Sequence, residues 1–412
     1  MEPKLIDHLF RHHYGKMVSV LVRIFGLAHL ETIEDAIQDT FIKATISWKN
    51  TPPEHPEAWL TQAAKNRVLD LFRKLKAAHK RVPNLTTGTE TIAIQELFLD
   101  TEIEDSQLRM IFTACHPRLN PKDRISFALK TVSGFSHKEI AAALLTKEET
   151  IKKRLSRART VIQREGVSFK IPQGKALSNR LNSVMEVLYL IFNEGFHSTK
   201  KELLIRKELC AEAMRLCQLL LTHKSTQTPK VYALFAVMCF HAARIDSKTN
   251  HDNELMDLRH QNRSLWYFPL VALGNTAMHK AVEGADFSSY HYEAAIAAEH
   301  LKASSFEKTN WKAILKWYQH LYELEPMSIY ILNMAVVQLQ DKRFRESYQL
   351  LQQLVPETLG QRRYLYYATL SDYYLTQEEY PNAIKYIDLA LDLVTNLQEK
   401  KYLEKKRVAM IL

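Results

Sequence analysis

Apolar residues recur at helical spacing along most of the chain, and hardly any segment shows the alternation typical of a strand. The first part predicts three amphipathic helices, over residues 5–25, 32–48 and 56–80. The second of them has an acidic exposed side, and the third has an apolar stripe opposite a row of Lys and Arg. We therefore expect an all-α protein that begins with a small helical domain over residues 1–81.

A second helical unit is expected after a segment that predicts a linker rather than a helix. Residues 82–105 mix Thr-rich and acidic stretches and predict a linker, whereas residues 106–170 predict a compact unit that ends in a helix-turn-helix. Ser136, with Glu139 three residues later, predicts a capping box at the start of the first helix of this motif. Thr146 is expected to cap the second helix.

The second helix of the motif has two chemically different sides. Its inward stripe is expected to be Ile151, Leu155, Ala158 and Ile162. Its outward residues are then Lys152, Lys153, Ser156, Arg157, Arg159 and Thr160. Cations and small polar groups on one face suit the major groove of DNA, where phosphate contacts give affinity and base edges give sequence reading. The alternative is a solvated surface helix within an ordinary helical bundle.

The remainder, residues 175–412, predicts a helical array with the internal register of a tetratricopeptide repeat. Equivalent positions are expected to be Ala383, Ile387 and Ala390, then Ser347, Leu351 and Leu354, then Ala313, Trp317 and His320. Stacked repeats form a concave surface, which suits a peptide or another protein domain as a ligand.

Composition narrows the function classes. With only 10 Gly among 412 residues, no pair of glycines has the spacing of GxGxxG, of the Walker phosphate loop or of GxSxG. Since no nucleophile and base pair emerges from the spacing either, we expect no enzyme and no cofactor. His8, His12 and His13 lack further ligands, so no metal site is predicted.

Charge and cysteines indicate the surroundings of the protein. Most of the formal net charge of +10 lies in residues 1–172, which points to an anionic partner. The 4 Cys form no CxxC motif, which favours reduced thiols and a cytoplasmic location. No apolar run is long enough to span a membrane and the first residues lack a signal-peptide core, so no membrane partner is expected.

The order of these parts resembles the extracytoplasmic-function (ECF) sigma factors, which direct bacterial RNA polymerase to promoters. Glu34–Phe41 resembles the region 2 helix that docks on the clamp coiled coil of the β′ subunit. Ala58–Asp70 resembles the next helix, which melts and reads the −10 element, although the preceding segment Lys49–Glu57 is short and proline-rich compared with the family. The helix-turn-helix corresponds to region 4, which reads the −35 element.

The C-terminal array resembles the tetratricopeptide-like extension of one subgroup of these sigma factors. The stretches that carry this likeness are Leu188–Phe196, Gln261–Trp266 and Ala294–His300. The resemblance implies that the extension has an internal regulatory or supporting role, since this subgroup usually lacks a neighbouring anti-sigma factor.

The resemblance implies a sigma factor whose partners are core RNA polymerase, through its β and β′ subunits, and promoter DNA. Polymerase contacts are expected from Glu34, Asp35, Gln38 and Asp39. Contacts with −10 DNA are expected from Trp59, Lys65, Asn66, Arg67, Arg73 and Lys74, with Trp59 either stacking on bases or serving as core. Contacts with −35 DNA are expected from Glu149, Thr150, Lys152, Lys153, Arg154, Ser156, Arg157 and Arg159.

Two other functions fit parts of the chain. One is a helix-turn-helix transcriptional regulator with a repeat sensor domain that never contacts polymerase, and the other is a repeat-based interaction scaffold with incidental basic charge. Residues 31–81 separate the regulator from a sigma factor, because a simple regulator needs no acidic docking helix followed by a basic helix. Failure to bind any promoter DNA alongside core polymerase would favour the scaffold.

Overall fold

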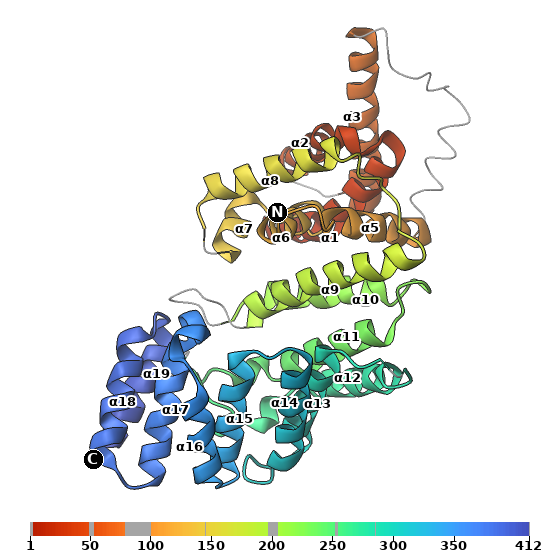
Figure 1. Cartoon of the computed structure of the whole chain (residues 1–412). Helices are drawn as coiled ribbons and strands as arrows, with labels where there is room; N and C mark the ends of the chain where they lie inside the picture. Colours follow the sequence, from red (N-terminus) through yellow and green to blue (C-terminus); the bar gives the residue numbers. More distant parts are fainter. Residues whose placement is uncertain are drawn as a thin grey trace. The chain divides into compact units, whose positions relative to one another are not determined.

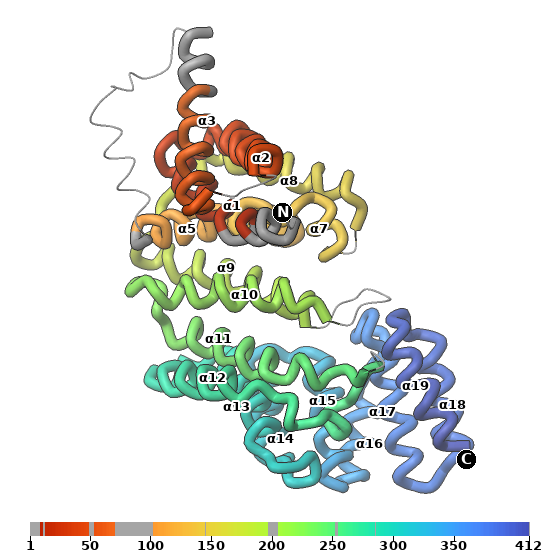
Figure 2. The backbone as a smooth tube through the Cα atoms, turned by 180° about the vertical axis from the view of Figure 1, so that it is seen from behind, coloured from red at the N-terminus to blue at the C-terminus, as the bar shows by residue number. Residues whose placement is uncertain are grey.

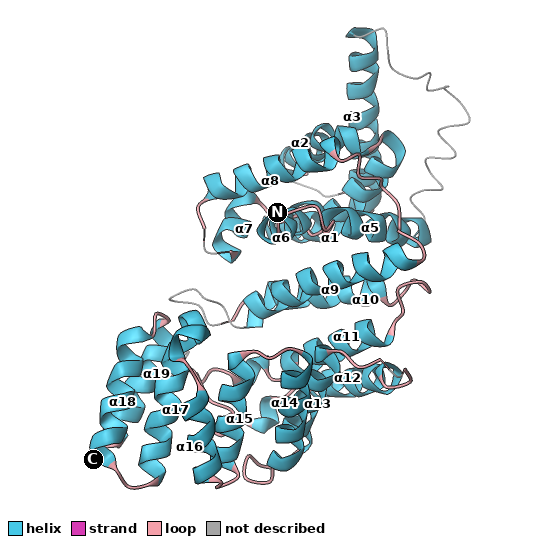
Figure 3. Cartoon of the chain, in the orientation of Figure 1, coloured by secondary structure: helices cyan, strands magenta, loops and turns pink. Residues whose placement is uncertain are grey.

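The all-α prediction is confirmed. The computed structural model describes residues 3–48, 53–78, 100–144, 146–196, 205–251, 254–284 and 286–411. These residues form α-helices, short 3-10 turns and one isolated bridge between Thr249 and Leu255, with no named strand among them (Figure 3). None of the helices described in these ranges is long and apolar enough to cross a membrane.

The chain divides into two compact units, Met1–Ile191 and Phe192–Leu412. The division falls inside a helix and differs from the predicted boundary at residue 175. Most of the predicted linker, over residues 79–99, lies outside the described residues, and residues 100–105 already belong to a helix. The segments 1–81 and 106–170, expected as separate domains, belong to one unit.

The first unit is organised around its first helix (Figures 1 and 2). Its helices are α1 (Pro3–Phe25), α2 (Leu30–Ser47), α3 (Pro56–Ala78), α5 (Asp100–Ala114), α6 (Pro121–Thr131), α7 (His137–Ala143), α8 (Glu148–Arg164) and α9 (Lys175–Phe196). Helix α1 contacts α2, α3, α5 and α6. Tyr14, Val18 and Leu21 of α1 are fully buried, because partners cover it on several sides.

The helix-turn-helix is formed by α7 and α8. The capping box is confirmed: the Glu139 amide donates to Ser136 Oγ (3.2 Å), and the Ser136 amide donates to Glu139 Oε2 (2.8 Å). The prediction for Thr146 is wrong, because α8 begins one residue later and its N-cap is Lys147, which makes no side-chain cap. The Thr146 amide instead bonds to the carbonyl of Ala141 (3.0 Å) and closes the turn.

The inward stripe of α8 is as predicted. The stripe residues Ile151, Leu155, Ala158 and Ile162 are all buried. Helix α8 packs against α6 and α7, so its apolar side is covered from within the same unit.

The second unit is a succession of helices that pack mostly against their neighbours in sequence. They are α10 (Lys207–Leu220), α11 (Pro229–Ala242), α12 (Phe268–Ala281), α13 (Ser289–Lys302), α14 (Trp311–Leu324), α15 (Ser328–Gln340), α16 (Phe344–Gln353), α17 (Arg363–Thr376), α18 (Tyr380–Leu393) and α19 (Leu397–Ala409). Lys342 and Glu378 each have positive φ (62° and 60°) two residues after the end of α15 and α17. The same turn therefore recurs 36 residues apart, as a repeat requires.

The predicted repeat register holds for two helices and fails for a third. Ala383, Ile387 and Ala390 are buried in α18, and Ser347 and Leu351 are buried in α16. For α14 the register Ala313, Trp317 and His320 is wrong by one residue, since Ile314 and Leu321 are the buried positions. Ile314 is the fourth residue of its helix, as Ser347 and Ala383 are of theirs, so the first spacing is 33 residues rather than 34.

A backbone contact inside the first unit gives a stability prediction. A Cβ added to Gly15 in α1 would lie 1.8 Å from the carbonyl oxygen of Val132, at the end of α6. Because neither backbone moves cheaply, Gly15→Ala should lower the free energy of unfolding of this unit by about 3 kcal/mol. The measurement is chemical denaturation of the full chain.

Gly166→Asn is the matched control. Gly166 has φ +57° and nothing within 4 Å of an added Cβ, and Asn tolerates this conformation at a cost of about 1 kcal/mol or less. Equal denaturation midpoints for the two variants would contradict the close approach of α1 and α6.

Candidate nucleic-acid and polymerase interface

Helix α2 carries the residues expected to contact polymerase, and they lie in different surroundings. Asp35 is exposed. Asp39 is about half exposed and pairs with Arg67 of α3 (2.9 Å). Gln38 is partly exposed and hydrogen bonds to Tyr14 of α1. Of this set, Asp35 is thus the acid most open to a basic partner.

Glu34, the remaining residue expected to contact polymerase, is buried, with 2% of its surface exposed. Its Oε2 accepts from Arg159 Nη2 of α8 (2.5 Å), and its Oε1 accepts from the hydroxyl of Tyr14 (3.3 Å). Glu31 lies 3.7 Å from the same guanidinium. Burial and the charge of Glu34 raise the pKa of Tyr14 well above its usual value. We call the contact of Glu31 and Glu34 with Arg159 the α2–α8 clasp.

Helix α3 carries the residues expected to contact −10 DNA, and two of its cations are not free at the surface: one is buried and the other is paired. Lys65 is buried, and burial lowers its pKa. Arg67 is held by Asp39 as described. Asn66 is exposed and its Oδ1 accepts from Gln62 Nε2 (3.1 Å). The side chains of Arg73 and Lys74 lie outside the described part.

Trp59 packs against the core and is also partly exposed. Its ring lies 5.2 Å from that of Trp48 in an edge-to-face arrangement, and Trp48 is buried with 3% exposure. Trp59 itself is partly exposed, at the start of α3. One side of the ring is core, and the other remains open to solvent.

The outer face of α8 differs from the prediction in the direction of its arginines. Arg159 points to α2 through the clasp and is 23% exposed, so the expectation that it faces outward is wrong. Arg157 is exposed and forms a two-pronged pair with Asp123 of α6 (3.2 and 2.9 Å). Lys152 lies 3.6 Å from Glu148.

The rest of the predicted −35 set lies along α8 in mixed exposure. Lys153, Ser156 and Glu149 are exposed, while Thr150 and Arg154 are partly exposed. Lys153 forms no ion pair within 4.0 Å with any residue that the structure describes. It is therefore a cation of this helix whose charge no described acid neutralises.

The packing of helix α9 against the first unit was not predicted from the sequence. The side chain of Arg180 donates to the carbonyl of Phe112, and Ser183 Oγ donates to the carbonyl of Cys115 (2.8 Å). Arg124 Nη1 donates to Ser183 Oγ (2.6 Å). The buried positions Leu181, Val184, Met185 and Leu188 form the apolar stripe that could have indicated this packing. The first turns of α9 thus belong to the unit that precedes the predicted break.

The titratable pair Cys115–His116 lies next to this contact. Burial raises the pKa of the Cys115 thiol to about 12, and burial followed by the charge of Arg180 lowers the pKa of His116 to about 4. Neither value suits a reactive thiolate at neutral pH. Within the part of the chain that the structure describes, no group of three or more His, Cys, Asp or Glu side chains could hold a metal ion.

Models of three protein families match successive parts of the chain. Residues 9–78 match sigma-70 region 2, and residues 109–161 match sigma-70 region 4. Residues 180–282 match a family of unknown function (DUF6596). The first match ends with α3, the second ends within α8, and the third begins within α9.

One known protein resembles nearly the whole chain, and two others resemble little more than a third of it. An uncharacterized protein of Rhizobium meliloti, R00370, is 31% identical over 94% of this chain and 91% of its own length. The ECF RNA polymerase sigma factor SigE of Mycolicibacterium smegmatis is 29% identical over 37% of this chain, which spans 58% of that protein. The ferric citrate uptake sigma factor FecI of Escherichia coli is 27% identical over 37% of this chain and 85% of its own length.

The two sigma-70 family models thus cover α2, α3 and most of α8, and the Rhizobium protein matches nearly the whole chain, extension included. A helix-turn-helix regulator without polymerase contacts is excluded by the match to region 2. The chain belongs to the ECF sigma factors of RNA polymerase and carries a helical C-terminal extension after regions 2 and 4.

Proposed function

We propose that this sigma factor offers the exposed acid of α2 to the β′ subunit of core polymerase, α3 to the −10 element and α8 to the −35 element. Region 4 then also faces the β subunit. The observation that carries the proposal is the division of charge: Asp35 on α2 is exposed, and exposed Lys153 and Ser156 lie on α8. The protein acts by binding, in the cytoplasm, and performs no catalytic step of its own.

The α2–α8 clasp represents a closed arrangement in this proposal. Glu34 has 2% exposure and is bound to Arg159, so neither residue is open to polymerase or DNA while the clasp is formed. Core polymerase and promoter DNA therefore both compete with the internal ion pair between Glu34 and Arg159. Opening costs free energy, because the ion pair with Arg159 is lost, and water or a new cation at the Glu34 carboxylate must offset that loss.

The extension is proposed to act on the same molecule. Helix α9 contributes Lys175–Ile191 to the first unit and continues without interruption into the second. Its contacts with the carbonyls of Phe112 and Cys115 lie on α5 and just after it, next to α6. A ligand or partner of the extension is proposed to support or restrain region 4.

Charge reversal on α2 tests polymerase docking. Asp35→Lys should weaken association with core polymerase by tenfold or more, because it brings a like charge against a basic partner surface. Run-off transcription on promoter fragments should fall in parallel, and co-purification with core enzyme measures the binding step. Glu283→Lys reverses an equally exposed acid in the extension and is the control. Equal association of both variants would contradict the docking assignment.

Removal of the exposed lysine of α8 tests promoter contact. Lys153→Ala in the reconstituted holoenzyme should reduce the slope of log K against log salt by about 0.9, the value for one lost phosphate contact. Filter binding across a salt series provides the slope. Arg164→Ala, where Glu165 neutralises the side chain (2.9 Å) at the far end of the helix, should leave the slope unchanged. A slope unaltered by Lys153→Ala would remove this residue from the DNA-facing surface.

A double-mutant cycle tests the clasp. Arg159→Ala should lower the free energy of unfolding by about 1–3 kcal/mol, because it leaves the Glu34 carboxylate buried without its cation. Adding Glu34→Gln should recover part of the loss, since an amide needs no counter-charge. The variant with Arg159→Ala alone should also associate faster with core polymerase, because the closed arrangement is weakened. A coupling energy of zero between the two positions would contradict the clasp.

A further inference from the structure

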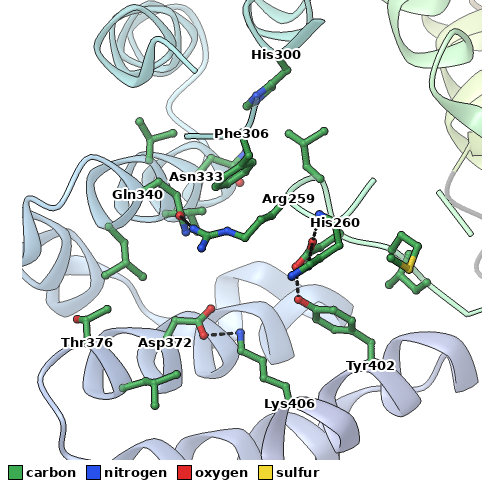
Figure 4. Close-up of a pocket in the computed structure, with 18 of the residues that line it drawn as sticks. Arg259, His260, His300, Phe306, Asn333, Gln340, Asp372, Thr376, Tyr402 and Lys406 are labelled. Atoms are coloured by element: carbon green, nitrogen blue, oxygen red, sulfur yellow. Dashed lines mark hydrogen bonds and ion pairs between the residues drawn. The ribbon is translucent and has the colours of Figure 1, made fainter. Parts of the chain in front are cut away.

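The second unit contains an extended segment that interrupts its helices. Between α11 and α12 the chain forms 3-10 turns and the isolated bridge from Thr249 to Leu255 rather than an α-helix. Residues 254–260 of this segment lie against side chains of α14, α15, α17 and α19 (Figure 4). A stretch of the chain itself thus lies along the inner side of these helices.

Three side-chain bonds fix this segment to distant helices. Tyr402 of α19 donates to Asp257 Oδ2 (2.6 Å), and Lys405 Nζ donates to Glu254 Oε1 (2.6 Å). Arg259 Nη2 donates to Gln340 Oε1 at the end of α15 (2.9 Å). These bonds hold the segment beside α15 and α19.

A cavity of about 860 Å³ remains between the segment and the helices. This volume lies in the range of sites that bind small molecules, which are about 300–1,000 Å³. Its walls are mainly apolar and aromatic, with Phe306, Trp311, Tyr318 and Leu375 among the side chains that form them. Such a cavity favours a ligand with an apolar body.

The cavity is lined by more cationic than acidic side chains. Five Lys or Arg and three Asp or Glu line it. Each acid has a partner: Glu254 binds Lys405, Asp257 binds Tyr402 and His260, and Asp372 binds Lys406. The remaining cations Arg259, Lys342 and Lys401 form no ion pair within 4.0 Å with any described residue.

Arg259 lines the cavity, and two contacts hold its guanidinium in place. Its guanidinium lies 4.7 Å from the centre of the Phe306 ring and is held by the neutral amide of Gln340 (Figure 4). The side chain is exposed to solvent and its charge acts on the nearby Glu307 without an ion pair within 4.0 Å, so the guanidinium can still pair with an anion that enters the cavity. A planar guanidinium held in this way suits a two-pronged bond to a carboxylate.

A buried polar atom in the wall is left without a partner. Nδ1 of His300 has no hydrogen-bond partner among the described residues, although it is shielded from solvent. Burial, and then the charges of Arg244 and Arg263, lower the pKa of His300 to about 3, so its ring is neutral. The imidazole can thus offer a neutral hydrogen bond to a polar group of a ligand.

We propose that this cavity binds a small organic carboxylate, with its aromatic or alkyl body against the apolar walls and its anionic group at Arg259. Charge complementarity selects an anion, and the apolar walls select a hydrophobic body. The bound molecule would join the segment 254–260 to α15 and α19 and would stabilise the second unit. The site does not depend on promoter or polymerase binding, so it stands or falls separately from the proposed function.

Calorimetric titration of the full-length protein tests the site with four probes. They are 1-naphthoate, decanoate, the neutral analogue naphthalene-1-methanol and the cation 1-naphthylmethylammonium. At least one of the two carboxylates should bind below ~1 mM and raise the Tm of the protein, while naphthalene-1-methanol should bind at least tenfold more weakly than 1-naphthoate. The cation should not bind measurably.

Variants locate the site. Arg259→Gln should weaken carboxylate binding about tenfold without changing the affinity for naphthalene-1-methanol, and Arg259→Lys should restore part of it. Val336→Phe adds bulk to the cavity wall and should weaken all ligands, which provides a test independent of charge. Lys385→Ala removes an exposed cation of α18 outside the cavity and should change nothing.

Four outcomes would overturn the proposal. They are no carboxylate binding below ~1 mM, equal binding of the cation, unchanged carboxylate binding in both Arg259→Gln and Val336→Phe, and a loss in Lys385→Ala as large as in Arg259→Gln. If a peptide binds instead and frees residues 254–260 to protease, the groove is a peptide site and the small-molecule assignment fails.

Discussion

Burial of one apolar stripe per helix is the constraint on which the rest of this structure depends. An isolated amphipathic helix is marginal in water, so each stripe must find a neighbour. In the first unit α1 supplies that neighbour for four other helices, and its approach to the end of α6 is so close that position 15 has room only for Gly. In the second unit each helix relies mainly on the next one, as in other repeat proteins. The stability of the first unit therefore depends most on the contacts of its central helix. The stability of the second unit depends on every contact between neighbouring helices.

Local rules explain how much of this fold the sequence could predict. The capping box at Ser136 and the stripe of α8 follow from chemistry within one or two helical turns, and both are present. The register of α14 was missed because a repeat can lose a residue in a loop without changing its helices. The direction of Arg159 was also missed, because a cation on a helix faces solvent or an acid according to a partner 125 residues away. No pattern of period 3.6 contains that information.

The same limit applies to the candidate site. From the sequence, most Lys and Arg of α3 and α8 are expected as possible DNA contacts, whereas Arg67, Arg157 and Arg159 are held by Asp39, Asp123 and Glu34. An internal acid that holds a guanidinium competes with phosphate for it. DNA binding by these residues therefore requires exchange of one charge partner for another, and its net free energy is smaller than the contact alone would give. Lys153 has no such exchange to make, which singles it out on α8.

The segment 254–260 and α9 connect these considerations to control of the sigma factor. A ligand in the cavity changes promoter activity only if it binds one arrangement of the protein better than another, and by the amount of that difference. Because α9 belongs to both units, a change in the second unit that alters its first or last turns alters the contacts of Arg180 and Ser183 with the end of α5. Such coupling is reciprocal. A ligand of the cavity that changed the affinity for core polymerase would have its own affinity changed by the same factor when polymerase binds.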